Sequence, residues 1–280
     1  MSIYAISDLH LSFGAPEKAM DVFGTGWFGY MDKIEREWRA IIKDGDYVLL
    51  PGDFSWATYI NDAKGDFSFL EGLPGKKVLS KGNHDYWWTT MSKMNEFLFK
   101  NGFKTIEFLH NNSMILPGGV GVTAARGWMR PDTAGFNELD EKIYRRELIR
   151  LRLSFESLAQ LRLVDKNGNK TMEEFGDHNN DGIVTDGCGT LGCGKVILML
   201  HYPPVIRGSG FADAYKGDID ARKSDFNDFS DIIEEYKPDV CLYGHMHGDK
   251  ASAAFEGTAS GTAYRLVSAD YLGFKPALIL

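Results

Sequence analysis

The chain has 280 residues and a formal net charge of −8 at pH 7, with 44% hydrophobic and 25% charged residues. This length allows one large α/β domain with a full core, or two small ones, and the composition is ordinary for a globular protein. The acidic balance argues against nonspecific binding to nucleic acid or to an anionic membrane surface. No apolar run approaches the ~20 residues of a membrane span.

Five short apolar runs, rich in Val, Ile, Leu and Tyr and with little alternation, are typical of strands buried on both faces. They are Ile3–Ser7, Tyr47–Pro51, Lys77–Ser80, Val196–Leu200 and Val240–Tyr243. Helical spacing predicts helices at Met31–Ile42, Tyr86–Lys100, about 137–163 and Ser230–Tyr236. Two late runs, Ala263–Ala269 and Pro276–Leu280, are predicted as strands that complete a second sheet.

A polar cluster directly follows each of the five apolar runs named first. These clusters lie at the carboxyl ends of the predicted strands, where open α/β sheets place their ligands. Five of the seven histidines fall in these clusters, whereas a chance distribution would scatter them along the chain. The clusters are Asp8-Leu9-His10, Gly52-Asp53, Gly82-Asn83-His84-Asp85, His201 and Gly244-His245-Met246-His247.

The chemistry of this set indicates metal binding. It offers imidazole and oxygen ligands without thiolate, which suits two divalent transition metal ions such as Mn, Fe or Zn. The Asp53 carboxylate has two oxygens and can bridge two cations. Each residue also has a structural alternative: a single histidine often lies satisfied in a core, and Asp85 could cap the helix predicted at Tyr86–Lys100. For the whole set the metal interpretation is favoured, because burying these groups together costs several kcal/mol without compensation.

The ordered blocks resemble those of the calcineurin-like metallophosphoesterase superfamily and span residues 8 to 247. The resemblance implies an α/β fold, a four-layer α/β/β/α sandwich of two mixed sheets flanked by helices, formed by a single domain over residues 1–280. It implies one metal held by Asp8, His10, Asp53 and His247, and a second held by Asp53, Asn83, His201 and His245. His84 would act on the substrate phosphate as general acid or clamp, and Asp85 would pack or orient.

The implied function is a dinuclear-metal-dependent phosphoesterase that hydrolyses a small phosphate ester by attack of a metal-bridging hydroxide, with a slight preference for phosphodiesters. The alternatives are a phosphomonoesterase and, less favoured, a non-catalytic binding scaffold. Trp56 stands where protein Ser/Thr phosphatases carry an aspartate and purple acid phosphatases a tyrosine, which argues against both subfamilies. A nucleic acid is expected only in the form of a nucleotide substrate.

Substrate contacts are harder to read from the sequence. Arg126, Arg130 and Arg207 could bind phosphate oxygens, although a surface or structural role is the simpler interpretation. Aromatic residues in loops could form a rim that suits a flat leaving group, or could simply pack on the core. The rim candidates are Phe13, Trp27, Trp87, Trp88 and Trp128.

A polar insertion is predicted at about 165–194, between the long helix and the Val196 strand. Asp177–Ile183 matches the start of a calcium loop, but Cys188 stands where a bidentate glutamate belongs, and a polar hairpin is the alternative to calcium binding. The three cysteines fit a reducing compartment, in which Cys188 and Cys193 stay free thiols. Because Ile3–Ser7 is predicted as a core strand rather than a signal peptide, we expect a cytoplasmic protein.

Overall fold

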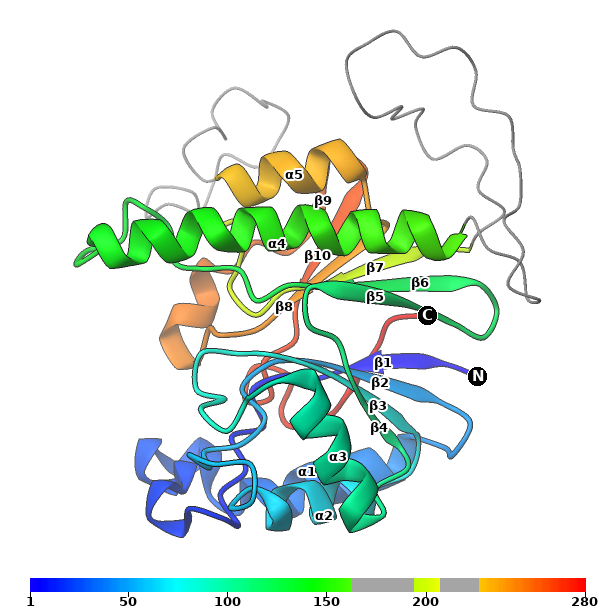
Figure 1. Cartoon of the computed structure of the whole chain (residues 1–280). Coiled ribbons are helices and arrows are strands. Elements are labelled where there is room, and N and C mark those ends of the chain that lie inside the picture. Colours follow the sequence, from blue (N-terminus) through cyan, green and yellow to red (C-terminus); the bar gives the residue numbers. More distant parts are fainter. Residues whose placement is uncertain (163–193, 207–226) are drawn as a thin grey trace, which may run out of the picture.

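Two β-sheets face each other at the centre of the computed structural model, which describes residues 1–162, 194–206 and 227–280. Helices cover the outer face of each sheet, so four layers are stacked in Figure 1. This confirms the predicted α/β/β/α arrangement of two mixed sheets flanked by helices. The insertion predicted at about 165–194, with its calcium-like pattern and two cysteines, lies outside the described residues except for its last one. Arg207 lies outside them too.

The first sheet has the strand order β11-β1-β2-β3-β4, in which β1 to β4 are parallel and β11 is antiparallel to β1. All five residues of β2 are buried, because the sheet is covered on both faces. The strands are β1 (Ile3–Ala5), β2 (Tyr47–Pro51), β3 (Lys76–Ser80), β4 (Ile106–Phe108) and β11 (Ala277–Leu278).

The second sheet has the order β5-β6-β7-β8-β10-β9. Its four central strands are parallel, and the edge strands β5 and β9 are antiparallel to their neighbours. The strands are β5 (Asn112–Leu116), β6 (Val120–Ala124), β7 (Val196–Met199), β8 (Val240–Tyr243), β9 (Gly257–Ala259) and β10 (Thr262–Leu266). The core between the sheets is aliphatic, with Leu49 and Val78 from the first sheet against Val122 and Leu242 from the second.

The helices bury one face each against the sheets. Ile34 and Trp38, one turn apart on α1, are both fully buried in the core beneath the first sheet. The helices over that sheet are α1 (Tyr30–Ile41), α2 (Lys64–Glu71) and α3 (Met91–Asn101), and those over the second sheet are α4 (Glu138–Arg162) and α5 (Asp228–Tyr236). Short 3-10 helices occupy Pro16–Lys18, Met20–Phe23, Thr25–Trp27 and Gly248–Ala253. None of the described helices has the length and apolar character needed to cross a membrane.

Two sequence predictions were wrong in part. Helix α3 begins at Met91 and not at Tyr86, and its N-cap is Thr90, whose side chain accepts a hydrogen bond from the Lys93 amide at 3.4 Å. Asp85 therefore caps no helix. The C-terminal strand β11 does not join the second sheet. It pairs with β1 at the edge of the first sheet, with Ala277 opposite Ala5.

The carboxyl ends of the two sheets are joined at one point, which brings the loops of both sheets together. Ser7 follows β1 and pairs with Ser268, which follows β10. The Ser7 amide donates to the Val267 carbonyl at 2.7 Å, and the Ala269 amide donates to the Ser7 carbonyl at 3.0 Å. Loops that leave β1, β2, β3, β7 and β8 thus meet on the same side of the molecule.

Candidate metal centre

Four of the predicted site residues adopt the left-handed backbone conformation, which residues other than glycine rarely adopt. The φ angles are 57° at Asp8, 45° at His10, 51° at Asp53 and 72° at His245. Each of these residues lies within five residues after the end of a core strand. Backbone strain of this kind persists only where surrounding contacts enforce it, and it concentrates at functional sites.

Two glycines of the sequence blocks are required because the backbone passes close to buried side chains at these positions. A Cβ atom on Gly82 would overlap the carboxylate of Asp53, and a Cβ atom on Gly244 would overlap the side chains of Ser7 and Asp8. The backbone after β3 and after β8 can therefore pass the two carboxylates only as glycine. This is the physical reason for the glycine before Asn83 and before His245.

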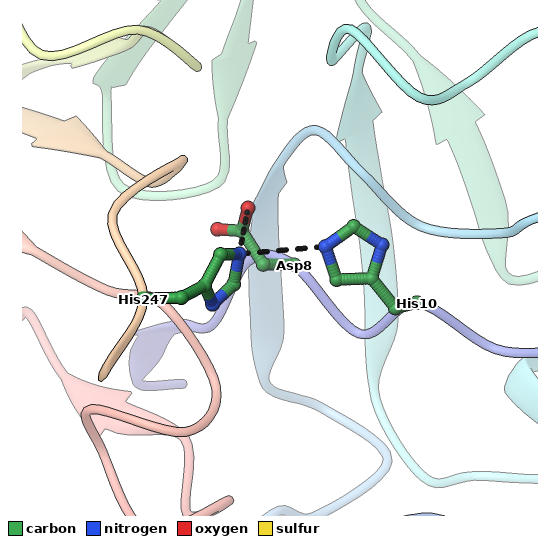
Figure 2. Close-up of side chains that lie close together, drawn as sticks. All are labelled: Asp8, His10 and His247. Carbon is green, nitrogen blue, oxygen red and sulfur yellow. Dashed lines mark hydrogen bonds and ion pairs between the residues drawn. The ribbon is translucent and has the colours of Figure 1, made fainter. Parts of the chain in front are cut away.

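The first group of side chains comprises Asp8, His10 and His247, shown in Figure 2. The Nε2 atoms of the two histidines lie 3.4 Å apart, and Nε2 of His247 lies 3.3 Å from Oδ1 of Asp8. The ligand atoms of this group all lie within 4.8 Å of one another. Asp8 and His10 are buried, and the side chain of His247 is 28% exposed.

The second group forms around the amide oxygen of Asn83. Oδ1 of Asn83 lies 2.7 Å from Nε2 of His201 and 2.9 Å from Nδ1 of His245. Nε2 of His201 also lies 3.4 Å from Oδ2 of Asp53, and both of these side chains are buried. Three elements far apart in sequence, after β3, β7 and β8, supply this group.

Asp53 lies between the two groups. Its Oδ2 atom is 3.8 Å from Nε2 of His10 and 3.4 Å from Nε2 of His201, so one oxygen faces a histidine of each group. Its Oδ1 atom accepts the backbone amide of His84 at 2.8 Å. The ligand atoms of Asp8, Asp53 and His201 also lie within 4.8 Å of one another.

Asp8 has one oxygen held by neighbours and one directed at His247. Oδ2 accepts the hydroxyl of Ser7 and, at 3.1 Å, the hydroxyl of Ser268. The His245 amide lies 3.1 Å from both carboxylate oxygens. The carboxylate is thereby fixed with Oδ1 toward the first group.

Two further contacts orient the histidine rings. Nδ1 of His247 lies 2.8 Å from Oδ1 of Asp270, and Nδ1 of His201 lies 3.1 Å from the Pro51 carbonyl. In the neutral rings, both contacts favour the tautomer with the proton on Nδ1, in which the Nε2 lone pair is directed into the site. The sequence analysis missed Asp270. The available signal was its position just after the run Ala263–Ala269, the same relation to a strand that Asp8 has to the first run.

The electrostatic field of the carboxylates favours positive charge at this position. Burial opposes charge on His201 and His247, yet Asp53 raises the pKa of His201 to about 9, and Asp270 and Asp8 raise that of His247 to about 10. Burial lowers the pKa of His10 to about 4 and that of His245 to about 3, so these two rings stay neutral and able to ligate.

The donor set fits divalent transition metal ions. Potential ligand atoms approach one another closely in each group: the Nε2 atoms of His10 and His247 lie 3.4 Å apart, and the Asn83 oxygen lies 2.9 Å from Nδ1 of His245. Oxygen and imidazole ligands with fixed ring orientation are the set that Mn, Fe and Zn accept. A cation in each group would bind these atoms together and compensate for the burial of the carboxylates.

Asp85 does not face the groups of donors but holds the surrounding loops. Its carboxylate accepts the amides of Asp53 at 2.9 Å, Phe54 at 2.9 Å and Gly82 at 2.8 Å, together with the indole N–H of Trp87 at 3.0 Å. Burial and the neighbouring Asp53 raise the pKa of this carboxyl to about 6. Asp85 thus ties the loop after β2 to the loop after β3.

His84 lies beside the donors in an aromatic setting. Its ring centroid is 4.5 Å from that of Trp56 and 5.7 Å from that of His10, and Trp56 stacks on His10 at 4.7 Å. Nδ1 of His84 is buried and has no hydrogen-bond partner among the described residues. Burial lowers the pKa of His84. The sequence analysis identified Trp56 only by the residues it replaces, and not as a wall of the site.

The aromatic rim predicted from the sequence is only partly present. Trp87 and Trp88 are buried in the core beneath the first sheet and form no rim, while Phe13 is 47% exposed and packs against Phe69. Trp27 is buried, but its ring lies 5.8 Å from that of His247. Among the arginines, Arg130 pairs with exposed Asp132 at 2.8 Å.

The chain belongs to the calcineurin-like phosphoesterase family, whose sequence model matches residues 1–249. Membership supports metal-dependent hydrolysis of a phosphate ester, which agrees with the geometry described above. No curated protein matches the chain in sequence.

The solved structures that this chain is similar to share little of its sequence. A protein of unknown function from Aquifex aeolicus, AQ665, is 14% identical, with 99% of this chain and 95% of that chain covered and a TM-score of 0.45. The sulfate thiohydrolase SoxB of Thermus thermophilus is 14% identical, with 96% and 52% covered and a TM-score of 0.43. The purple acid phosphatase PPD1 of yellow lupin is 14% identical, with 99% and 44% covered and a TM-score of 0.43.

Proposed function

We propose that the protein is a phosphoesterase that depends on two metal ions and prefers phosphodiesters over phosphomonoesters. The observation that carries the proposal is the position of Asp53, whose Oδ2 atom lies 3.8 Å from His10 and 3.4 Å from His201. A carboxylate oxygen that faces one histidine of each group is placed to be shared by two cations.

The ligands divide between two sites as follows. Asp8, His10 and His247 would hold one ion and Asn83, His201 and His245 the other, with Asp53 common to both. Asp8 contributes Oδ1, because its Oδ2 is held by serine hydroxyls. His245 contributes Nδ1, which is the ring nitrogen that approaches Asn83. When bound, such a pair of ions supplies a water of lowered pKa and neutralises charge on phosphate oxygens.

His84 is the catalytic residue in this proposal. Its ring lies beside His10, while its backbone amide is fixed on Asp53, so it borders both groups without belonging to either. Nδ1 of the ring is buried, so the nitrogen proposed to bind a phosphate oxygen or to protonate a leaving oxygen is Nε2. Trp56 packs against the ring and limits its rotation.

The preference for diesters rests on what surrounds His84. In the described part of the chain no carboxylate accepts a hydrogen bond from its ring, and burial lowers its pKa although Asp53 and Asp8 act in the opposite direction. A histidine of lowered pKa is protonated in a smaller fraction of molecules near neutral pH, which favours esters with good leaving groups. The Trp56 and Trp27 rings near the donors also suit an organic substituent on the phosphate.

The test is a comparison of two chromogenic substrates with the same leaving group. The manganese-loaded protein is assayed with bis(4-nitrophenyl) phosphate and with 4-nitrophenyl phosphate at matched pH and metal concentration. We expect a higher kcat/KM for the diester. Turnover of the monoester alone would reassign the protein as a phosphomonoesterase, and turnover of neither, in a protein that holds two ions, would favour a binding scaffold.

A further inference from the structure

Basic residues gather beside the group formed by Asn83, His201 and His245, and the proposed function does not use them. Lys81 follows β3 and stands two residues before Asn83. Arg126 follows β6, and its backbone carbonyl accepts the amides of His201 at 3.0 Å and Tyr202 at 3.1 Å. The main chain thus places both basic residues next to metal-ligand candidates.

A row of aromatic rings connects the Arg126 side chain to the candidate metal centre. Its guanidinium carbon lies 4.3 Å from the centre of the Trp128 ring, and that ring lies 5.2 Å from the Tyr202 ring. Tyr202 in turn lies 4.3 Å from the His245 ring. The Arg126 side chain is only 14% exposed, and its Nε atom is buried without a hydrogen-bond partner among the described residues.

Positive charge exceeds negative charge in this cluster. Glu147 of α4 is fully buried, and a single oxygen, Oε1, receives Arg126 at 3.2 Å and Arg150 at 2.6 Å. Lys81 has no ion pair or hydrogen bond from its ammonium group within the described ranges. Two buried carboxylates, Glu147 and Asp85, thus lie near three cationic side chains, in a chain whose formal net charge is −8.

These charges act on a neighbouring histidine. Burial, together with Arg150, Lys81 and Arg126, lowers the pKa of His110 to about 4. All of these groups are thus close enough to act on one another, and His110 adds a neutral imidazole to the cluster.

We propose that Lys81, Arg126 and Arg150 form a subsite for a second phosphate group carried by the substrate. Unpaired donors on guanidinium and ammonium groups bind phosphate oxygens with charge-assisted hydrogen bonds. The subsite rests on the proposed function for its place in catalysis, and it narrows the substrate class to phosphate esters that bear a further phosphate on the organic group. The competing explanation of these basic residues is a structural ion-pair network that binds no ligand.

The experiment compares two diesters that differ by one phosphate: the 5′-(4-nitrophenyl phosphate) of thymidine and the same compound with a 3′-phosphate. With the manganese-loaded protein we expect the 3′-phosphate to raise kcat/KM about tenfold or more, mainly through a lower KM, and salt to reduce this gain. Lys81→Met and Arg150→Gln should each bring the ratio of the two kcat/KM values close to one. Lys93→Met, an exposed lysine on α3, is the matched control and should keep the wild-type ratio.

Equilibrium binding separates this inference from the proposed function. Thymidine 3′,5′-bisphosphate should bind the metal-loaded wild-type protein about tenfold more tightly than thymidine 5′-monophosphate, and Lys81→Met should remove the difference. If neither diester is hydrolysed but this binding difference is present, the proposed function fails and the subsite stands. A ratio near one in the wild-type protein, or a ratio that both variants leave unchanged, would overturn the subsite.

Discussion

Nδ1 of His247 lies 2.8 Å from Oδ1 of Asp270, and this contact determines which nitrogen of the ring faces Asp8 and His10. The other oxygen of Asp270 accepts the Gly248 amide at 3.0 Å, so the carboxylate is itself held in place. A carboxylate behind a histidine fixes the ring tautomer and makes the distal nitrogen a better donor to a metal.

Replacing Asp270 should therefore weaken metal binding without removing a ligand. We expect Asp270→Asn to lower the affinity for the manganese ion assigned to His247 by about 10- to 100-fold, because partners of this kind contribute that much. The measurement is a manganese titration against a competing chelator. Asp249→Asn, at an exposed carboxylate two residues after His247, is the control and should bind as the wild type does. Equal affinity in both variants would mean that Asp270 has only a structural part.

The shared position of Asp53 leads to a test by metal stoichiometry. After reconstitution with manganese, elemental analysis should find close to two ions per chain in the wild type, close to none in Asp53→Asn and close to one in Asn83→Ala. The difference arises because Asp53 faces a histidine of each group, whereas Asn83 contacts His201 and His245 alone. A wild-type protein that holds at most one ion contradicts the two-metal proposal.

Most of this site was predictable from the sequence because its residues occupy one repeated position. Asp8, Asp53 and His201 each follow a buried strand closely, and parallel strands bring their carboxyl ends to one edge. The pattern of apolar runs also predicted the five strands that carry the site, with boundaries that agree to within two residues.

Other features depend mainly on contacts between distant segments. Asp270 follows a predicted strand, but its part in the site is shown by its contact with His247, 23 residues earlier, and that of Trp56 by its stacking on His10. The start of α3 was placed too early because Trp87 and Trp88 continue the apolar pattern, although they pack in the core before the helix begins. Strands β4, β5 and β9, which the sequence analysis did not predict, lie at sheet edges. Short segments of this kind carry little periodicity.

His84 should affect turnover and leave the metals in place. We expect His84→Ala to keep the wild-type metal content and to lower kcat and kcat/KM together by roughly 10²–10⁴, since a group that acts only in the transition state changes both. The reason is its position beside His10 with only its backbone amide bound to Asp53. Elemental analysis and steady-state kinetics are made on the same preparation. Loss of metal from this variant would place His84 among the ligands instead.

Lys77 provides a prediction about stability and pH that is independent of the candidate metal centre. Its side chain is fully buried in β3, with the ammonium group bound to the Leu73 carbonyl and, at 2.9 Å, to the Thr105 hydroxyl. Burial lowers the pKa of this lysine to about 8 from its ordinary value of 10.5. No sequence pattern indicates this burial, because a lysine at the start of a predicted strand is usually exposed.

The sign of the effect follows from proton binding. Between pH 8 and 10.5 the unfolded chain keeps the proton on Lys77 and the folded chain releases it, so the free energy of unfolding contributed by this group rises with pH in that window. Relative to Lys77→Met, the wild type should gain up to about 3 kcal/mol on going from pH 8 to pH 10.5, at about 1.4 kcal/mol per pH unit. Urea unfolding of both proteins across this range measures the difference, in which titrations common to both cancel. A difference that stays constant with pH would show that Lys77 has an ordinary pKa in the folded protein.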